Sequence, residues 1–250
     1  MNTDELLEIA MVSARRAGLI LSELYRQNCK NLSEDKNEIK LQADKESEEA
    51  ILDVLTATPY PVLSEETGWT KEYVINKPYW VVDPLDGSFN FSRKIPFSAV
   101  SIALMKNEET VLGVVYDFLR DEMFSASEDT GARLNNNPIH VSSTQKASEA
   151  VIATGFPIVR PYNDNEFYEY LNELKRFNRV RLLGPSALSL AYVACGRVDA
   201  FIQDEVKIWD ISAGTALVQF AGGVVTIEHI EGVPFTKKIR SACRKEIWIS

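Results

Sequence analysis

The chain has 250 residues and a mass of 28.1 kDa, and its 45% hydrophobic and 25% charged residues exclude a disordered chain, a collagen and a coiled-coil rod. Asp and Glu number 36 against 27 Lys and Arg, so the net charge is −9 and we expect no nucleic-acid partner. Two histidines and three widely spaced cysteines argue against a paired-histidine zinc site and a disulfide framework, and reduced cysteines favour a cytoplasmic protein. No apolar run approaches about 18 residues, so we expect no membrane partner.

Hydrophobic periodicity predicts two helices separated by a polar loop at the start of the chain. Apolar residues at spacings of three and four favour helices over 3–27 and 43–57. The charged stretch 28–41 between them has the composition of a mobile loop. Runs rich in β-branched residues then predict an antiparallel meander. Its strands are expected over 99–105, 111–117 and 122–125, after two separate short strands over 61–64 and 79–82. A further loop or hairpin is expected over 131–138.

Helical and strand patterns alternate in the second half of the chain. Helices are expected over 164–175, 186–195 and 209–221. Strands are expected over 151–154, 179–183, 199–202, 224–227 and 246–249. These patterns predict an α+β fold, a layered α-β-α-β-α sandwich. The antiparallel meander would belong to an N-terminal half (1–140) that carries the metal and phosphate site. A mixed sheet with helices would form a C-terminal half (141–250) that contacts substrate, both within one compact unit.

The segment after the strand at 79–82 has the composition of a metal site. Asp83 and Asp86 are three residues apart, so their carboxylates can converge. Pro84 fixes its own φ and favours an extended Asp83, and the turn would expose the Leu85 carbonyl. Two carboxylates and a carbonyl form a hard oxygen site suited to Mg²⁺.

Gly87 and Ser88 follow this turn directly and can begin a short helix that ends near Phe91. The first N–H groups of a helix have no partner within it and therefore attract anions. Metal ligands beside such N–H groups constitute a phosphate site. The alternative is a solvated, Asp-rich turn between two strands.

Further acidic residues could join this site. Glu65 and Glu66 follow the strand at 61–64, which could lie parallel to the next strand and bring a glutamate to the same end. Taken alone, such a pair is usually part of a solvated loop. Asp210 and Asp44 each lie at the start of a predicted helix, where the usual role of an aspartate is to cap the helix.

Three separated segments resemble signatures of the inositol monophosphatase family of Mg²⁺-dependent phosphatases. Residues 64–67 (Ser-Glu-Glu-Thr) resemble its glutamate motif, and residues 83–91 (Asp-Pro-Leu-Asp-Gly-Ser-Phe-Asn-Phe) resemble its Asp-Pro-Ile-Asp-Gly-Thr signature. Residues 209–214 (Trp-Asp-Ile-Ser-Ala-Gly), with Ala-Gly-Gly at 221–223, resemble its Trp-Asp-x-Ala-Ala-Gly … Ala-Gly-Gly signature. The serine in the second signature and the Arg-Leu-Leu-Gly segment at 181–184 are most similar to archaeal members. Those are described as dual inositol monophosphatases and fructose-1,6-bisphosphatases.

This resemblance implies two or three bound Mg²⁺ ions. Glu65, Asp83 and the Leu85 carbonyl would hold the first ion. Asp83, Asp86 and Asp210 would hold the second, and Glu65 could reach a third through water.

The resemblance also implies how the substrate is held and attacked. Ser88 matches a threonine that pairs with an aspartate at the place of Asp44, and this pair would orient or deprotonate the attacking water. The N–H groups of Gly87 and Ser88 would hold the phosphate. No protein nucleophile is required. The substrate polyol would contact Asp86, Gly184, Pro185, Ser186, Ala187 and Gln203.

Some positions depart from the family pattern. Gln203 stands where animal members carry a glutamate for inositol hydroxyls. Arg93 and Lys94 replace a usually small, uncharged pair. Such a pair is by default solvated surface, yet in an acidic protein it could attract a second phosphate. Arg181 is another candidate for that phosphate, unless it pairs with an acidic group under the substrate loop.

These features together predict a Mg²⁺-dependent phosphomonoester hydrolase that forms a homodimer. Its phosphorylated sugar or polyol substrate would be fructose 1,6-bisphosphate and/or inositol 1-phosphate, attacked by metal-activated water. One alternative is a 3′(2′),5′-bisphosphate nucleotidase or NADP phosphatase. A covalent aspartyl phosphatase that uses Asp83 is a second, and a catalytically degenerate family member that acts as a binding protein is a third.

Overall fold

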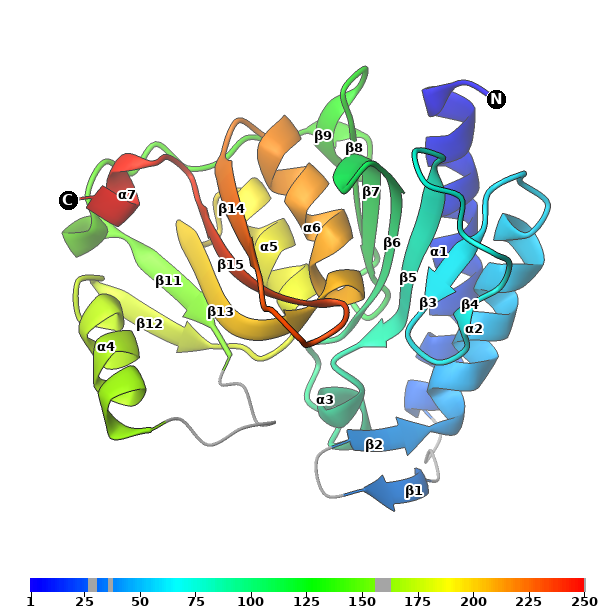
Figure 1. Cartoon of the computed structure of the whole chain (residues 1–250), viewed down its shortest axis with the longest axis horizontal. Helices are drawn as coiled ribbons and strands as arrows, with labels where there is room; N and C mark the ends of the chain where they lie inside the picture. Colours follow the sequence, from blue (N-terminus) through cyan, green and yellow to red (C-terminus); the bar gives the residue numbers. More distant parts are fainter. Residues whose placement is uncertain (27–30, 36–37, 156–162, 250) are drawn as a thin grey trace.

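The computed structural model describes residues 1–26, 31–35, 38–155 and 163–249. Helices and two large sheets alternate in layers (Figure 1). The helices are α1 (Thr3–Arg26), α2 (Gln42–Leu55), α3 (Ser88–Ser92), α4 (Asp164–Leu174), α5 (Ser186–Ala194), α6 (Ile208–Phe220) and α7 (Glu246–Ile249), with a 3-10 turn at Ala147–Glu149. The strands are β1 (Asn31–Asp35), β2 (Glu38–Leu41), β3 (Val62–Ser64), β4 (Gly68–Trp69), β5 (Tyr79–Asp86), β6 (Ala99–Lys106), β7 (Glu109–Asp117), β8 (Glu122–Ser127), β9 (Gly131–Leu134), β10 (Asn137–Pro138), β11 (Val151–Thr154), β12 (Arg179–Leu182), β13 (Ala200–Lys207), β14 (Val224–His229) and β15 (Thr236–Ala242).

Eight strands form the first sheet and five form the second. The first sheet has the order β10-β9-β8-β7-β6-β5-β3-β4 and is antiparallel except for the parallel pair β3 and β5. The second has the order β12-β11-β13-β15-β14, in which β11 runs parallel to both β12 and β13. The expected antiparallel meander and mixed sheet are therefore confirmed.

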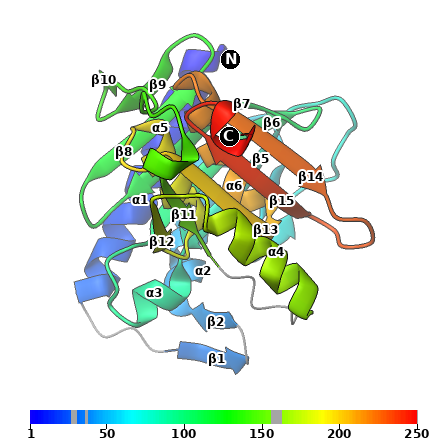
Figure 2. The same ribbon diagram turned by 90° about the vertical axis from the view of Figure 1, so that its left-hand side faces the viewer.

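The layers follow from the alternation of side chains along the strands. Trp80 and Val82 of β5 are buried with α1 and α2 on the outer face of the first sheet. Tyr79 and Val81 point the other way and are buried with α5 and α6, which lie between the two sheets. Helices α4 and α7 cover the outer face of the second sheet (Figures 1 and 2). This α-β-α-β-α order is the predicted one.

Glycine allows α6 to approach both of its neighbours closely. A Cβ atom on Gly113 of β7 would lie 2.4 Å from the carbonyl oxygen of Ala213 in α6. A Cβ on Gly214 would lie 2.4 Å from the Cβ of Leu190 in α5. Contacts this short leave no room for a larger residue, so α6 lies directly on the first sheet. None of the described helices is long and apolar enough to cross a bilayer.

Two predicted boundaries in the first half were wrong. The expected loop over 28–41 contains the antiparallel ribbon of β1 and β2, while residues 28–30 and 36–37 lie outside the described chain. Strand β5 does not end at Asp83 but continues to Asp86. Its pairing with β6 is irregular between those two aspartates, which a pattern of apolar residues does not reveal.

The end of the chain also differs from the prediction. Residues 246–249 form α7 instead of the last strand, because Ile247 and Trp248 donate their N–H groups to carbonyls three residues earlier. Ile247 is fully buried against the second sheet, so its apolar character reflects helix packing. The last strand is β15, which the sequence did not indicate because its buried Ile239 stands between charged residues.

Candidate active site

The parallel pair β3 and β5 brings the first two acidic segments together. Ser64 of β3 is paired with Val82 of β5, and the N–H of Glu65 donates to the Val82 carbonyl at 3.1 Å. Because parallel strands end at the same edge of a sheet, Glu65 leaves β3 beside Asp83. The predicted parallel pairing is confirmed.

The turn after Asp83 is stabilised by one hydrogen bond within the turn and by another from helix α2. The Leu85 N–H donates to Asp83 Oδ1 at 2.9 Å. The buried hydroxyl of Ser47 in α2 donates to the Pro84 carbonyl at 2.7 Å. These two hydrogen bonds fix the orientation of the Asp83 carboxylate, whose residue is only 2% exposed.

Helix α6 brings the third acidic residue from the far half of the chain. Asp210 lies in its first turn, and Asp210 Oδ2 accepts a hydrogen bond from the Lys207 N–H at 3.1 Å. The Ser101 hydroxyl of β6 donates to the Trp209 carbonyl at 3.1 Å and ties the start of the helix to the first sheet. The N-cap of α6 is Lys207, so Asp210 is not the cap residue of the alternative interpretation; it lies three residues later, bonds back to the Lys207 N–H and also reaches the acidic site.

Glu65, Asp83 and Asp210 converge in space. Each offers one carboxylate oxygen, and the three atoms lie within 4.8 Å of one another. Burial raises the pKa of Asp83 well above its usual value, and the charges of Glu65, Asp86 and Asp210 raise it further. The self-repulsion of this cluster is what a bound cation would relieve, and three carboxylates are ligands that Mg²⁺ prefers. The donor set therefore fits the predicted ion.

Asp86 faces the segment predicted to contact substrate. Asp86 Oδ2 accepts a hydrogen bond from the Ala187 N–H at 2.7 Å, at the start of α5. Burial raises the pKa of Asp86 to about 7, and the Glu65 charge adds to this, while the hydrogen bond from Ala187 opposes it. Ser186, next to Ala187, donates its hydroxyl to Gln203 Oε1 at 3.1 Å. The structure thus brings the residues predicted to contact substrate to the side of Asp86.

Gly87 links the acidic turn to α3 in a conformation that requires glycine. Its φ is 86°, and an added Cβ would lie 2.5 Å from Pro185 Cγ. The Ser98 hydroxyl donates to the Gly87 carbonyl at 2.9 Å. Ser88 begins α3, as predicted, and the 184–187 segment packs against the same turn through Pro185.

Helix α2 carries a buried polar face of which the sequence analysis gave a role only to Asp44. Asp44, Ser47 and Glu48 are all at most 5% exposed and lie on one side of the helix at spacings of three and four. Glu48 accepts hydrogen bonds from both the N–H and the hydroxyl of Thr67 at 3.2 Å, just after the Glu65 segment. A signal was present for Ser47, which stands among apolar residues at helical spacing with Ala43 and Ile51.

The three candidate cations for a second phosphate have different surroundings. Lys94 donates to the Tyr25 carbonyl at the end of α1, and its ammonium lies 4.6 Å from the centre of the Tyr25 ring. Arg93 is exposed, with its guanidinium 5.9 Å from the Phe89 ring. Arg181 lies in β12, the outer strand of the second sheet, and donates to the neighbouring Val180 carbonyl at 3.1 Å. Lys94 thus has a structural contact that the sequence did not indicate.

Comparison with known proteins identifies the arrangement. The sequence matches the inositol monophosphatase family over residues 2–243. The chain belongs to this family. Among its members, the chain is 37% identical to the Nus factor SuhB of Pasteurella multocida over 226 residues, covering 88% of this chain and 84% of that protein. It is also 37% identical to the inositol-1-monophosphatase of Mesorhizobium japonicum over 231 residues, covering 90% and 86%.

A solved structure of the family supports the predicted resemblance to dual-function members. It is an archaeal inositol monophosphatase–fructose 1,6-bisphosphatase with a TM-score of 0.77 and 28% identity, covering 98% of this chain and 96% of that one. The expected absence of a nucleic-acid partner, in contrast, has no support, because a relative of this similarity is named as a Nus factor. Net acidic charge alone does not decide that question.

Proposed function

We propose that this protein is a Mg²⁺-dependent phosphomonoester hydrolase that releases phosphate from fructose 1,6-bisphosphate and/or inositol 1-phosphate. The observation that carries the proposal is the convergence of Glu65, Asp83 and Asp210 within 4.8 Å, from three separate elements of the fold. An acidic cluster of this kind would repel a phosphate on its own. Divalent cations bound between the carboxylates and the phosphate would replace this repulsion by attraction.

Glu65, Asp83 and Asp210 would hold Mg²⁺, together with Asp86 and the Leu85 carbonyl. The bound ions supply positive charge to the phosphate oxygens and lower the pKa of a nearby water. The hydrogen bonds from Leu85 and Ser47 to the β5 turn keep the ligands in place before the ions bind. This preorganisation favours binding because little conformational entropy is lost.

The other catalytic roles would fall to residues at the starts of α3 and α2, beside the turn at the end of β5. The Gly87 and Ser88 N–H groups would bind phosphate oxygens, supported by the positive φ of Gly87. Ser88 and Asp44 would orient the water and accept its proton. Asp44 is 5% exposed and lies on the same face of α2 as Ser47, which contacts the β5 turn.

Substrate hydroxyls would meet Asp86 and Gln203. Because Gln203 Oε1 accepts the Ser186 hydroxyl, its amide NH₂ group is left to donate to a substrate oxygen. Asp86 has one oxygen on the Ala187 N–H and a second for an ion or a hydroxyl. A donor at position 203 suits any hydroxyl or phosphate oxygen, which fits a broad range of sugar and polyol phosphates.

A substrate panel with Mg²⁺ tests the proposal. Phosphate release would be measured on fructose 1,6-bisphosphate, inositol 1-phosphate, adenosine 3′,5′-bisphosphate and NADP⁺ at equal enzyme concentration, with Asp83→Asn as the inactive control. Preference for the first two substrates supports the proposal. Preference for the nucleotides would establish the alternative activity, and no release on any substrate would favour a binding protein. A phosphoenzyme trapped on Asp83 would establish the covalent alternative.

Arg93 is the main candidate for the second phosphate of a bisphosphorylated sugar, because Lys94 contacts the end of α1. The double change Arg93→Ala with Lys94→Ala should raise KM for fructose 1,6-bisphosphate several-fold and leave inositol 1-phosphate unaffected. Arg93→Ala alone should reproduce most of this effect, and the effect should decrease as salt rises. Equal losses on both substrates would place the second phosphate elsewhere, with Arg181 the next residue to change.

We also infer that the protein forms a homodimer. All four residues of the outer strand β12 are exposed, including Val180 at 37% and Leu182 at 62%, and an uncovered apolar edge strand favours pairing. Light scattering after size exclusion should give about twice the chain mass of 28.1 kDa. A single-chain mass at micromolar concentration would contradict the dimer.

A further inference from the structure

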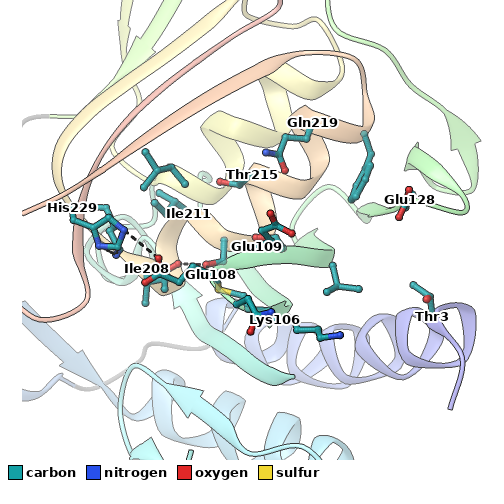
Figure 3. Close-up of a pocket in the computed structure, with 18 of the residues that line it drawn as sticks. Thr3, Lys106, Glu108, Glu109, Glu128, Ile208, Ile211, Thr215, Gln219 and His229 are labelled. Carbon is teal, nitrogen blue, oxygen red and sulfur yellow. Dashed lines mark hydrogen bonds and ion pairs between the residues drawn. The ribbon is translucent and has the colours of Figure 1, made fainter. Parts of the chain in front are cut away.

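A second concave site lies between the two sheets, along one face of α6. It is a groove of about 740 Å³ bounded by α6, the turn between β6 and β7, and the inner face of β14 and β15 (Figure 3). Its floor is one face of α6, formed by Ile208, Ile211, Thr215 and Gln219. The metal-site residues Glu65, Asp83 and Asp210 do not line it.

The shape of the groove fits an extended chain better than a helix. The floor runs from Ile208 to Gln219, which is about 16 Å at 1.5 Å per helical residue. An extended chain in a sheet occupies roughly 160 Å³ per residue, so 740 Å³ holds about five residues, which also span about 16 Å. A helix about 10 Å wide would fill the same volume within roughly 9 Å of its length. The length of the floor therefore matches about five extended residues.

The charge of the groove is uneven. Glu109, Glu128 and Asp129 all line it, and Figure 3 shows Glu128 toward the Gln219 end of α6. Lys106, which also lines the groove, is the strand partner of Glu109, so the net negative charge comes from Glu128 and Asp129. The carbonyl oxygen of Phe220 lies 3.9 Å from a Cβ placed on Gly131, which locates the turn between β8 and β9 next to the helix end. The negative end of the helix dipole adds to these carboxylates. This end of the groove therefore attracts cations.

The opposite end of the groove is closer to neutral. His229 of β14 lies 3.4 Å from the Glu108 carboxylate and 2.6 Å from the Lys237 ammonium. Ile227, 39% exposed, and Ile208 provide apolar surface beside them. This end suits an apolar side chain.

The floor also has unused hydrogen-bonding capacity. Thr215 is 5% exposed, and its Oγ1 has no hydrogen-bond partner in the described part of the chain. A buried hydroxyl without a partner is costly, and a threonine in a helix can adopt two rotamers. Rotation about χ1 would present this hydroxyl to a peptide group in the groove.

We propose that this groove binds an extended, basic segment of a partner protein, about five residues long. Apolar side chains of the segment lie on α6 toward Ile208, and a Lys or Arg lies beside Glu128 and Asp129. Backbone groups of the segment bond to Thr215 and Gln219. The proposal is independent of the phosphatase activity.

Selection from a phage library of random heptapeptides on the immobilised full chain tests this site. Wild-type protein should enrich peptides with a Lys or Arg next to apolar residues. The double variant Glu128→Lys with Asp129→Lys should bind a fluorescent peptide of the enriched sequence at least tenfold more weakly, because both positions are exposed and face the basic end. Glu49→Lys with Asp53→Lys, an equal charge change on the exposed face of α2, should bind as wild type does.

Filling the groove provides a second test. Ile227→Trp should weaken peptide binding at least tenfold, and thermal unfolding of the variant checks that the fold is intact. No enrichment, enrichment of acidic peptides, or equal binding to the Ile227→Trp and wild-type proteins would overturn the proposal. Loss of self-association in the Ile227→Trp variant would assign the groove to a second copy of the chain instead.

Discussion

Replacing Asp86 by Asn in the metal-free protein should make the fold more stable at high pH. Asp86 is 7% exposed, and burial with the Glu65 charge raises its pKa to about 7. The fold therefore opposes ionisation of this carboxyl, and the folded protein binds more protons than the unfolded one between pH 3.8 and about 7. Stability contributed by the neutral carboxyl is present at low pH and is lost as pH rises through 7.

The size of the effect follows from the two pKa values. A carboxyl with a pKa of about 7 when folded and 3.8 when unfolded destabilises the fold by about 4 kcal/mol at pH 8. Coupling to the neighbouring carboxylates divides this cost among them, so Asp86→Asn should recover about 2–4 kcal/mol. For a chain of this length that is roughly 5–15 °C in Tm. At pH 5, which lies between the unfolded pKa of 3.8 and the folded pKa of about 7, the gain should fall to less than half of its value at pH 8.

Thermal and urea unfolding in EDTA at pH 5 and pH 8, followed by tryptophan fluorescence, would measure this difference. Asp53→Asn, on the exposed face of α2, is the matched control and should change stability little at either pH. Adding Mg²⁺ should close most of this gap at pH 8 and reverse the order at high concentration, because an ion stabilises the wild type by about 2.7 kcal/mol at 100 times its dissociation constant and by about 4.1 kcal/mol at 1,000 times. A variant no more stable than the wild type at pH 8 in EDTA, or a gain of equal size at pH 5, would refute the argument.

Other substitutions test individual roles. Asp210→Asn should lower Mg²⁺-dependent phosphate release at least tenfold, because it removes one of three converging anionic oxygens; near-normal release at saturating Mg²⁺ would contradict the metal site. Ser88→Ala and Asp44→Asn should each reduce kcat by about 10²–10⁴ with little change in KM, the usual range for general acid–base assistance; unchanged kcat in both would leave them structural caps. Gly87→Ala should lower stability by more than about 1–2 kcal/mol, since its φ is 86° and the new Cβ would lie 2.5 Å from Pro185 Cγ; an unchanged Tm would disprove this steric argument.

The acidic cluster proposed to bind metal could be predicted because its residues end apolar strands or begin helices. Glu65 and Asp83 each follow a short apolar run, and parallel pairing of those runs was the simplest way to bring the two together. Asp210 stands at a helix start, and only the family signature distinguished a ligand from an ordinary cap. The positions of these acidic residues at strand ends and helix starts made them candidate ligands. Their convergence depends on packing between the two halves of the chain, which no local sequence pattern reveals.

The supporting residues could not be identified in this way. Ser47 and Glu48 are polar residues inside a helix, and nothing near them in the sequence names their partners, Pro84 and Thr67. The groove beside α6 was equally hidden, because its walls come from turns and strands far apart in the sequence. The ribbon of β1 and β2 was missed for another reason, since its strands are short and mostly polar, and the alternation of Ile39 and Leu41 covers only four residues.

The convergence of Glu65, Asp83 and Asp210 also has a consequence for folding. Glu65 and Asp83 come together when β3 pairs with β5. Asp210 lies 127 residues after Asp83, about half the length of the chain, and joins them only when α6 has packed on the first sheet. Such distant contacts carry a high loop-closure entropy and form late. A cation that needs all three carboxylates would bind only the assembled molecule. Its affinity would then report on completion of the whole fold, and partly synthesised chains that end before α6 would have no such protection.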